Sequence, residues 1–123
     1  MFYLKKKEIH KIKKMGMEIG SHGHSHRVLS LLNKKEQIAD IKKSLKILSD
    51  ITKAPIKVFC YPYGGKKVYN KNTIYSLKKL SIVYAFSVES RFFEKKDSLL
   101  EIPRFDCNDF PFGKAFIKNG KAI

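Results

Sequence analysis

The stretch Glu18-Ile-Gly-Ser-His-Gly-His-Ser-His26 gathers three of the chain's four histidines into five positions. Neutral imidazole is the commonest protein ligand for zinc and similar metals. His22 and His26 are four residues apart, so both can aim at one ion. The residues from Met15 to Ile19 form a short apolar, strand-like piece that turns at Gly20. The stretch therefore predicts metal ligands presented at the end of a strand, where many α/β sites lie.

The composition fits one small globular domain. The chain has 123 residues, of which 43% are hydrophobic and 12% aromatic, enough for one modest core. No run approaches the ~18 apolar residues of a membrane span. The N-terminal residues also lack the apolar segment of a signal peptide. As the sequence stands, we expect a cytoplasmic protein with no membrane segment.

The net charge of +15 raises the question of nucleic-acid binding. Of the 26 basic residues, only Arg27, Arg91 and Arg104 are arginines, and arginine supplies the bidentate contacts that read phosphate and guanine. The lysines are scattered along the whole chain. We interpret the charge as a solvated surface and expect no specific nucleic-acid partner. A non-catalytic basic module that binds an anionic polymer is the alternative to an enzyme, as is a degenerate remnant without function.

Hydrophobic periodicity and capping patterns predict the helices. Apolar residues at helical spacing indicate a helix over Phe2–Lys14, and Gly16 follows where a left-handed residue ends a helix. Asn33 and Glu36 have the spacing of a capping box at the start of a helix over about Lys34–Ile51.

A third helix carries an apolar stripe that includes Leu77, and Asn70 or Asn72 caps it. Strands are predicted over Met17–Ile19, Ile56–Tyr61, Ile82–Val88 and Leu99–Phe105. This alternation indicates parallel strands covered by helices. A short helix is expected after Phe112.

The run Ile56–Tyr61 is apolar except for Lys57, and we expect it to form a strand buried on both faces. Cys60 lies within it, so we interpret this cysteine as a small core residue. Together with Cys107 it defines no disulfide framework.

Closely spaced histidines occur in several kinds of metal site. A metallo-β-lactamase has His-x-His-x-Asp-His, and this loop lacks the aspartate. An amidohydrolase has His-x-His at the end of its first barrel strand and further distant histidines. Here a helix precedes the loop, and no histidine follows His26. The remaining alternative is a group of exposed loop histidines without a ligand.

Four short motifs follow one another along the chain: Glu18–His26, then Phe59-Cys-Tyr-Pro-Tyr-Gly64, Tyr84-Ala-Phe-Ser87 and Ile102-Pro-Arg-Phe105. In this order they resemble the polysaccharide deacetylase family, the NodB homology domain of carbohydrate esterase family 4. The first of the four is the most specific, because it matches the family's Gly-x-Glu-Ile-Gly-Ser/Asn-His-x-x-x-His loop. The resemblance spans about Leu4 to Asn108.

The resemblance implies a partial, distorted (β/α) barrel whose first strands are missing. It implies a hydrolase that removes acetyl groups from N- or O-acetylated carbohydrate with a divalent metal, zinc in the first place. His22 and His26 match the two histidine ligands, whereas His24 occupies a variable position. Tyr63 matches the residue whose backbone N–H binds the oxyanion. Arg104 resembles the arginine that orients the catalytic carboxylate.

Two further residues are substrate-binding candidates. Tyr61 and Pro62 belong to the Tyr-Pro-Tyr-Gly motif, and aromatic faces suit pyranose rings; core packing is the alternative for Tyr61. The implied partner is an acetylated polysaccharide or oligosaccharide. Full-length relatives can be exported or attached to the cell envelope.

The sequence departs from the family at the first family motif, usually Thr-Phe-Asp-Asp, which supplies the general base and the third metal ligand. No Asp-Asp pair occurs in this sequence. No counterpart of the family's late histidine follows His26, and Ser81 replaces a usual glycine. We therefore expect a single incomplete domain over residues 1–123, with little or no activity by itself.

Overall fold

The structure is a computed structural model that describes residues 3–110, 117–118 and 121–122. In it, helices alternate with short strands. In chain order the elements are α1 (Lys6–Lys14), η1 (Leu29–Leu31), α2 (Lys34–Thr52), β1 (Val58–Cys60), α3 (Lys71–Lys79), β2 (Tyr84–Phe86), η2 (Cys107–Asp109), β3 (Ile117–Lys118) and β4 (Lys121–Ala122). Strands β1 and β2 pair in parallel, whereas β3 and β4 pair antiparallel. None of the helices in this part of the chain is long and apolar enough to span a membrane.

The capping patterns place the helices correctly. The Asn33 side chain accepts a hydrogen bond from the N–H of Glu36, whose carboxylate accepts one from the N–H of Asn33, so the predicted capping box is confirmed. Asn70, rather than Asn72, caps α3. Helix α1 begins only at Lys6. The start of the predicted helix at Phe2 and the predicted helix start at Phe112 lie outside the described residues.

All three α-helices among the described residues are followed by a residue with left-handed backbone geometry, which after α2 is Lys53 with a φ of 57°. Gly16 follows α1 with a φ of 92°, as predicted. Ser81 follows α3 with a φ of 59°, and the next N–H, that of Ile82, donates to the Leu77 carbonyl at 3.0 Å. A side chain at such a position strains the backbone by about 1–2 kcal/mol relative to glycine. Ser81 therefore adopts at this helix end a backbone conformation that favours glycine.

The strand predicted over Met17–Ile19 is wrong. Only Ser21 forms a single parallel bridge with β1, through its N–H to the Val58 carbonyl at 2.8 Å. Gly23 turns the chain two residues later with a φ of 78°. The pairing ends at once because this turn carries the backbone away from β1.

The strand predicted over Leu99–Phe105 is also wrong. Of these residues, Ile102 forms a parallel bridge with β2: its N–H donates to the Ala85 carbonyl at 2.8 Å, and its carbonyl accepts from the N–H of Ser87 at 2.9 Å. Pro103 follows it and has no N–H with which to continue a ladder.

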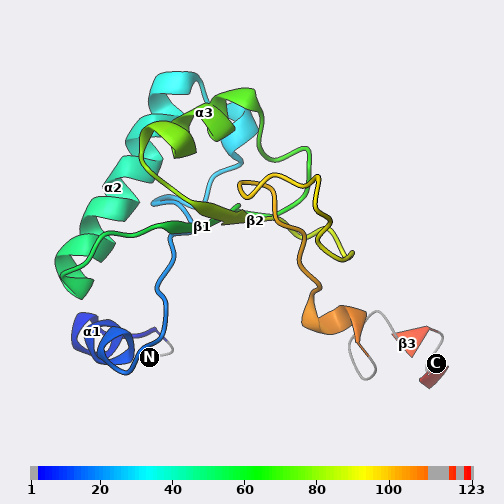
Figure 1. The fold of residues 1–123 in the computed structure, drawn as a ribbon, viewed down its shortest axis with the longest axis horizontal. Coiled ribbons are helices and arrows are strands. Elements are labelled where there is room, and N and C mark those ends of the chain that lie inside the picture. The colour runs from blue at the N-terminus through cyan, green and yellow to red at the C-terminus, as the bar shows by residue number, and fades with distance from the viewer. Residues whose placement is uncertain (1–2, 111–116, 119–120, 123) are drawn as a thin grey trace.

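The two faces of the β1–β2 sheet have different environments. Phe59 pairs with Ala85, and both side chains are fully buried on the face that α2 and α3 cover (Figure 1). Val58 and Cys60 on the opposite face are only half-buried, as is Phe86. The prediction that β1 is buried on both faces is therefore wrong, and Cys60 is not a core residue. Neighbouring residues of a strand point to opposite faces, so Phe59 and Cys60 have different environments although they are adjacent in the chain.

The core lies between the sheet and the helices. It joins residues from η1, α2 and α3 with the buried sheet face and the loop that follows β2. Its members are Leu29, Leu32, Ile41, Phe59, Tyr61, Tyr69, Leu77, Ile82, Ala85 and Leu100. This packing leaves the open sheet face and the histidine loop beside each other.

Candidate metal centre

His22 and His26 lie side by side in the loop that follows the Ser21 bridge. Their Nε2 atoms are 3.1 Å apart, and their ring centroids are 4.9 Å apart. Two imidazole nitrogens bound to one tetrahedral zinc ion at about 2.0–2.1 Å are themselves separated by about 3.3 Å. The two side chains are both exposed and fit a shared divalent ion.

A carbonyl of β1 orients the first of these rings. The Nδ1 atom of His22 lies 2.9 Å from the carbonyl oxygen of Cys60. Because a carbonyl can only accept, Nδ1 carries the proton and Nε2 keeps its lone pair. Such a partner behind the ring is the usual support of a metal-binding histidine.

The third histidine of the loop does not join the pair. His24 is exposed, and its backbone N–H donates to the carboxylate of Asp40 on α2 at 2.9 Å. Within residues 3–110, no group of three or more histidine, cysteine, aspartate or glutamate side chains is arranged to hold a metal. The described site thus offers two of the ligands that a metal would need.

The Tyr-Pro-Tyr-Gly turn lies directly beside the histidine pair. The Tyr63 ring centroid is 4.8 Å from that of His26, and the Tyr63 side chain is 60% exposed. Tyr63 has a φ of 64°, an uncommon geometry for a residue with a side chain. Among the described residues, none accepts a hydrogen bond from its N–H. This N–H therefore has no backbone partner within that part of the chain.

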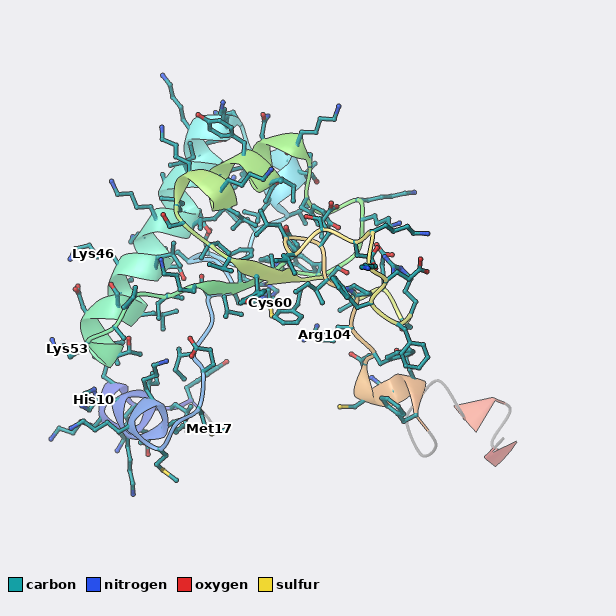
Figure 2. All side chains as sticks on the ribbon, in the orientation of Figure 1. His10, Met17, Lys46, Lys53, Cys60 and Arg104 are labelled. Carbon is teal, nitrogen blue, oxygen red and sulfur yellow. The ribbon has the colours of Figure 1, made fainter. Side chains whose placement is uncertain are left out.

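A hollow of about 590 Å³ opens on the exposed face of the sheet, next to His22. Its lining residues are Gly20, Ser21, His22, Val58, Cys60, Phe86 and Arg104. Figure 2 shows Cys60 and Arg104 on the side of the sheet away from α2 and α3. Burial raises the pKa of the Cys60 thiol, and the positive charge of Arg104 opposes this rise. Cys60 and Cys107 are both free thiols.

The side chains of Tyr61 and Pro62 lie in the interior instead of this hollow. Tyr61 is 2% exposed, stacks on Tyr69 at 3.9 Å between ring centroids, and donates its hydroxyl proton to the Leu100 carbonyl. Burial raises the pKa of Tyr61. Its ring therefore has the core-packing role, and neither ring offers a face to a sugar in this structure.

Two residues of α2 that the sequence did not single out hold the histidine loop. The hydroxyl of Ser44 lies 2.6 Å from that of Ser21, and both side chains are buried. The Asp40 carboxylate accepts hydrogen bonds from the loop backbone. Nothing in the sequence distinguishes these residues from the other polar residues of an amphipathic helix, because their partners are far away in the chain.

With this geometry established, comparisons with known proteins identify the fold. The family model described as polysaccharide deacetylase matches residues 3–85. The deacetylase PplD of Streptococcus pyogenes, solved in complex with acetate, is 22% identical with a TM-score of 0.76. The match covers 83% of this chain and 44% of PplD.

Two further solved structures have the same fold. The deacetylase domain of BpsB from Bordetella bronchiseptica is 15% identical with a TM-score of 0.77, and the match covers 85% of this chain and 49% of that one. BC0361, a polysaccharide deacetylase from Bacillus cereus, is 23% identical with a TM-score of 0.71, with coverage of 83% and 32%. The chain thus spans less than half the length of each of the three. It has the partial (β/α) barrel that its motifs imply. No match to it is found among curated proteins.

Proposed function

Because this chain belongs to the polysaccharide deacetylase family, we propose that it supplies the histidine pair of a metal-dependent hydrolase that deacetylates N- or O-acetylated carbohydrate. The proposal rests on the 3.1 Å separation of the His22 and His26 Nε2 atoms beside the Tyr63 turn. A divalent ion held there, zinc in the first place, would polarise an acetyl carbonyl and acidify a bound water.

The other residues of the site would act on the same acetyl group. In the hydrolysis a water oxygen bonds to the acetyl carbon, the C–N or C–O bond breaks, and a proton of the water passes to the sugar nitrogen or oxygen, which releases acetate and the free amine or hydroxyl. The Tyr63 N–H would donate to the carbonyl oxygen as negative charge develops on it. Arg104 shares the hollow with His22, which is consistent with the role of orienting a carboxylate. An acetylated polysaccharide or oligosaccharide is the proposed partner.

We expect the chain by itself to deacetylate poorly. An aspartate would have to accept the proton of the water, yet the sequence contains no Asp-Asp pair. Within residues 3–110, no carboxylate completes a metal site with the two histidines. Two imidazoles without a carboxylate also bind a cation less tightly.

Zinc titration of the purified chain tests the metal site. Isothermal titration of the unmodified chain, His22→Ala and His26→Ala should show binding that either substitution weakens. The loss should exceed the roughly 10- to 100-fold that changes behind the ligands cause. His24→Ala is the matched control from the same loop and should bind as the unmodified chain does. Equal binding by all four proteins would remove the metal site from the proposal.

Acetate release from acetylated chito-oligosaccharide tests the activity. We expect little or none from the purified chain, with or without added zinc. Release that a chelator abolishes would contradict the expected inactivity while supporting the proposed reaction.

The comparisons do not favour the alternative of a basic, non-catalytic module, because the matched family and the three structures are deacetylases. Fluorescence anisotropy with DNA and RNA at increasing salt would detect such a module, since phosphate binding weakens steeply with salt.

A further inference from the structure

The Asp40 carboxylate accepts three hydrogen bonds from two consecutive residues of the histidine loop. The N–H of His24 donates to Oδ2 at 2.9 Å, and the N–H of Ser25 donates to Oδ1 at 3.1 Å. The hydroxyl of Ser25 also donates to Oδ1. His24 and Ser25 stand between the two candidate ligands, so this carboxylate fixes the middle of the segment that joins them.

The loop backbone is shaped to approach this carboxylate. Gly23 has a φ of 78°, and a Cβ atom placed on it would lie only 3.1 Å from Oδ2 of Asp40. His26, at the far end, has a φ of 50°. Glycine adopts a positive φ readily, whereas for His26 it is an uncommon conformation that neighbouring contacts must hold in place.

Helix α2 contacts the loop at a second point on the same face. Ser44 is four residues after Asp40, one helical turn along. Its hydroxyl pairs with that of Ser21, which in turn accepts a hydrogen bond from the N–H of Gly23 at 3.2 Å. The beginning and the middle of the loop are thus attached to one rigid helix.

We propose that Asp40 is a positioning residue, which sets the spacing of the two imidazoles by clamping the loop between them. This inference rests on the proposed function, because positioning matters only if the histidine pair binds a cation. The hydrogen bonds of Asp40 within the described residues go to His24 and Ser25, so it acts through the backbone that joins the two rings.

The clamp needs a carboxylate, because only a carboxylate can accept from three donors without presenting one of its own. Partial burial raises the pKa of Asp40. The hydrogen bonds from the Ser25 side chain and from the backbone of His24 and Ser25 outweigh this effect, and the pKa lies below its usual value. In Asp40→Asn, an amide group would face one of the loop N–H donors.

The experiment compares Asp40→Asn with the matched control Asp50→Asn. Asp50 is another aspartate of α2, exposed and paired with Lys46, and its substitution removes the same charge away from the loop. Zinc affinity is measured by isothermal titration, and loop order by amide hydrogen exchange of residues 23–26 in metal-free protein. We expect Asp40→Asn to lower the zinc affinity about 10-fold or more and to speed exchange in the loop, with Asp50→Asn close to the unmodified chain.

Ser25→Ala separates positioning from charge. It leaves the Asp40 charge intact and removes one of the three hydrogen bonds, so positioning predicts weaker zinc binding, less than additive with Asp40→Asn. Unchanged zinc binding by Ser25→Ala would indicate a charge effect and overturn the proposal. Circular dichroism melts identify any variant that has unfolded, and Ser25→Ala is the milder of the two changes.

The outcomes also distinguish this inference from the proposed function. If the unmodified chain binds zinc and Asp40→Asn binds it equally well, the inference fails while the proposed metal site stands. If the unmodified chain binds no zinc, the proposed metal site fails. In that case hydrogen exchange tests the attachment of the loop to Asp40 by itself. Faster exchange of residues 23–26 in Asp40→Asn supports the clamp, and unchanged exchange overturns it.

Discussion

The histidine loop (residues 20–26) and the Tyr-Pro-Tyr-Gly turn (residues 61–64) meet at the candidate site but are held in different ways. Both contain left-handed backbone, at Gly23 and His26 in the loop and at Tyr63 and Gly64 in the turn. The loop is largely exposed and is fixed by hydrogen bonds to side chains of α2. The turn is fixed chiefly by packing, since it begins at the fully buried Tyr61, and the Gly64 carbonyl also accepts a hydrogen bond from the N–H of Val88 at 3.0 Å.

Because of this difference, we expect substitutions in the turn to affect stability and substitutions in the exposed loop to affect cation binding. Changes in the turn remove packed surface or force a clash, so they should lower the free energy of unfolding. Changes in the exposed part of the loop leave the core intact, so they should alter cation binding with little effect on unfolding.

The largest effect is expected for Tyr61→Ala, at the start of the turn. Removing a buried aromatic side chain costs about 3–5 kcal/mol of unfolding free energy, and the Leu100 carbonyl also loses its hydroxyl donor. Urea denaturation measures the change, with Tyr3→Ala as control because Tyr3 is 84% exposed. Similar stability of the two variants would contradict the packed turn.

Gly64→Ala should cause the second-largest loss of unfolding free energy. Gly64 has a φ of 69°, and a Cβ atom there would lie 2.5 Å from a methyl carbon of Val88. Backbone strain and overpacking together predict a loss of about 2–4 kcal/mol. The control is the next residue: Gly65→Ala meets nothing within 4 Å and should be nearly neutral in the same denaturation experiment.

Ser21→Ala tests the buried attachment of the loop. The substitution leaves the Ser44 hydroxyl buried without its partner, which costs about 1–3 kcal/mol. The double variant with Ser44→Ala should recover part of that loss, because both polar groups are then gone. A double variant whose loss equals the sum of the two single losses would show that the serine pair is not coupled.

The smallest effect concerns pH and lies in neither region. A hydrogen bond from the Arg91 guanidinium, followed by one from the N–H of Glu94, lowers the pKa of Asp97 to about 2. Since the folded-state pKa is the lower one, the contribution is present above the unfolded pKa of about 4 and is lost as the pH falls towards 2. Asp97→Asn should therefore flatten the acid end of a stability–pH curve, and an unchanged curve would contradict the pairing.

The sequence predicted the helices better than the strands. Helices α2 and α3 begin where Asn33 and Asn70 cap them, because capping and periodicity depend on residues within a few positions. Strand extent depends on a partner elsewhere in the chain. Of the strand predicted over Ile56–Tyr61, only Val58–Cys60 pairs with β2.

The sequence predicted the residues of the candidate site better than the residues that hold them in place. The spacing of His22 and His26 and the motif around Tyr63 pointed to the residues that the structure brings together. The Asp40 clamp was not foreseen, because its partners lie 15 and 16 residues away. The burial of Tyr61 was left open by its sequence, since an aromatic residue suits both a sugar site and a core.

By itself the sequence determined the helices, their caps, the histidine spacing and the deacetylase motifs, all of which are written in short runs of residues. Only the tertiary structure decided that Cys60 faces an open hollow while Phe59 enters the core, and that α2 holds the histidine loop. The physical reason is that strand pairing and helix packing determine which side chains are buried. That choice depends on residues distant in the chain.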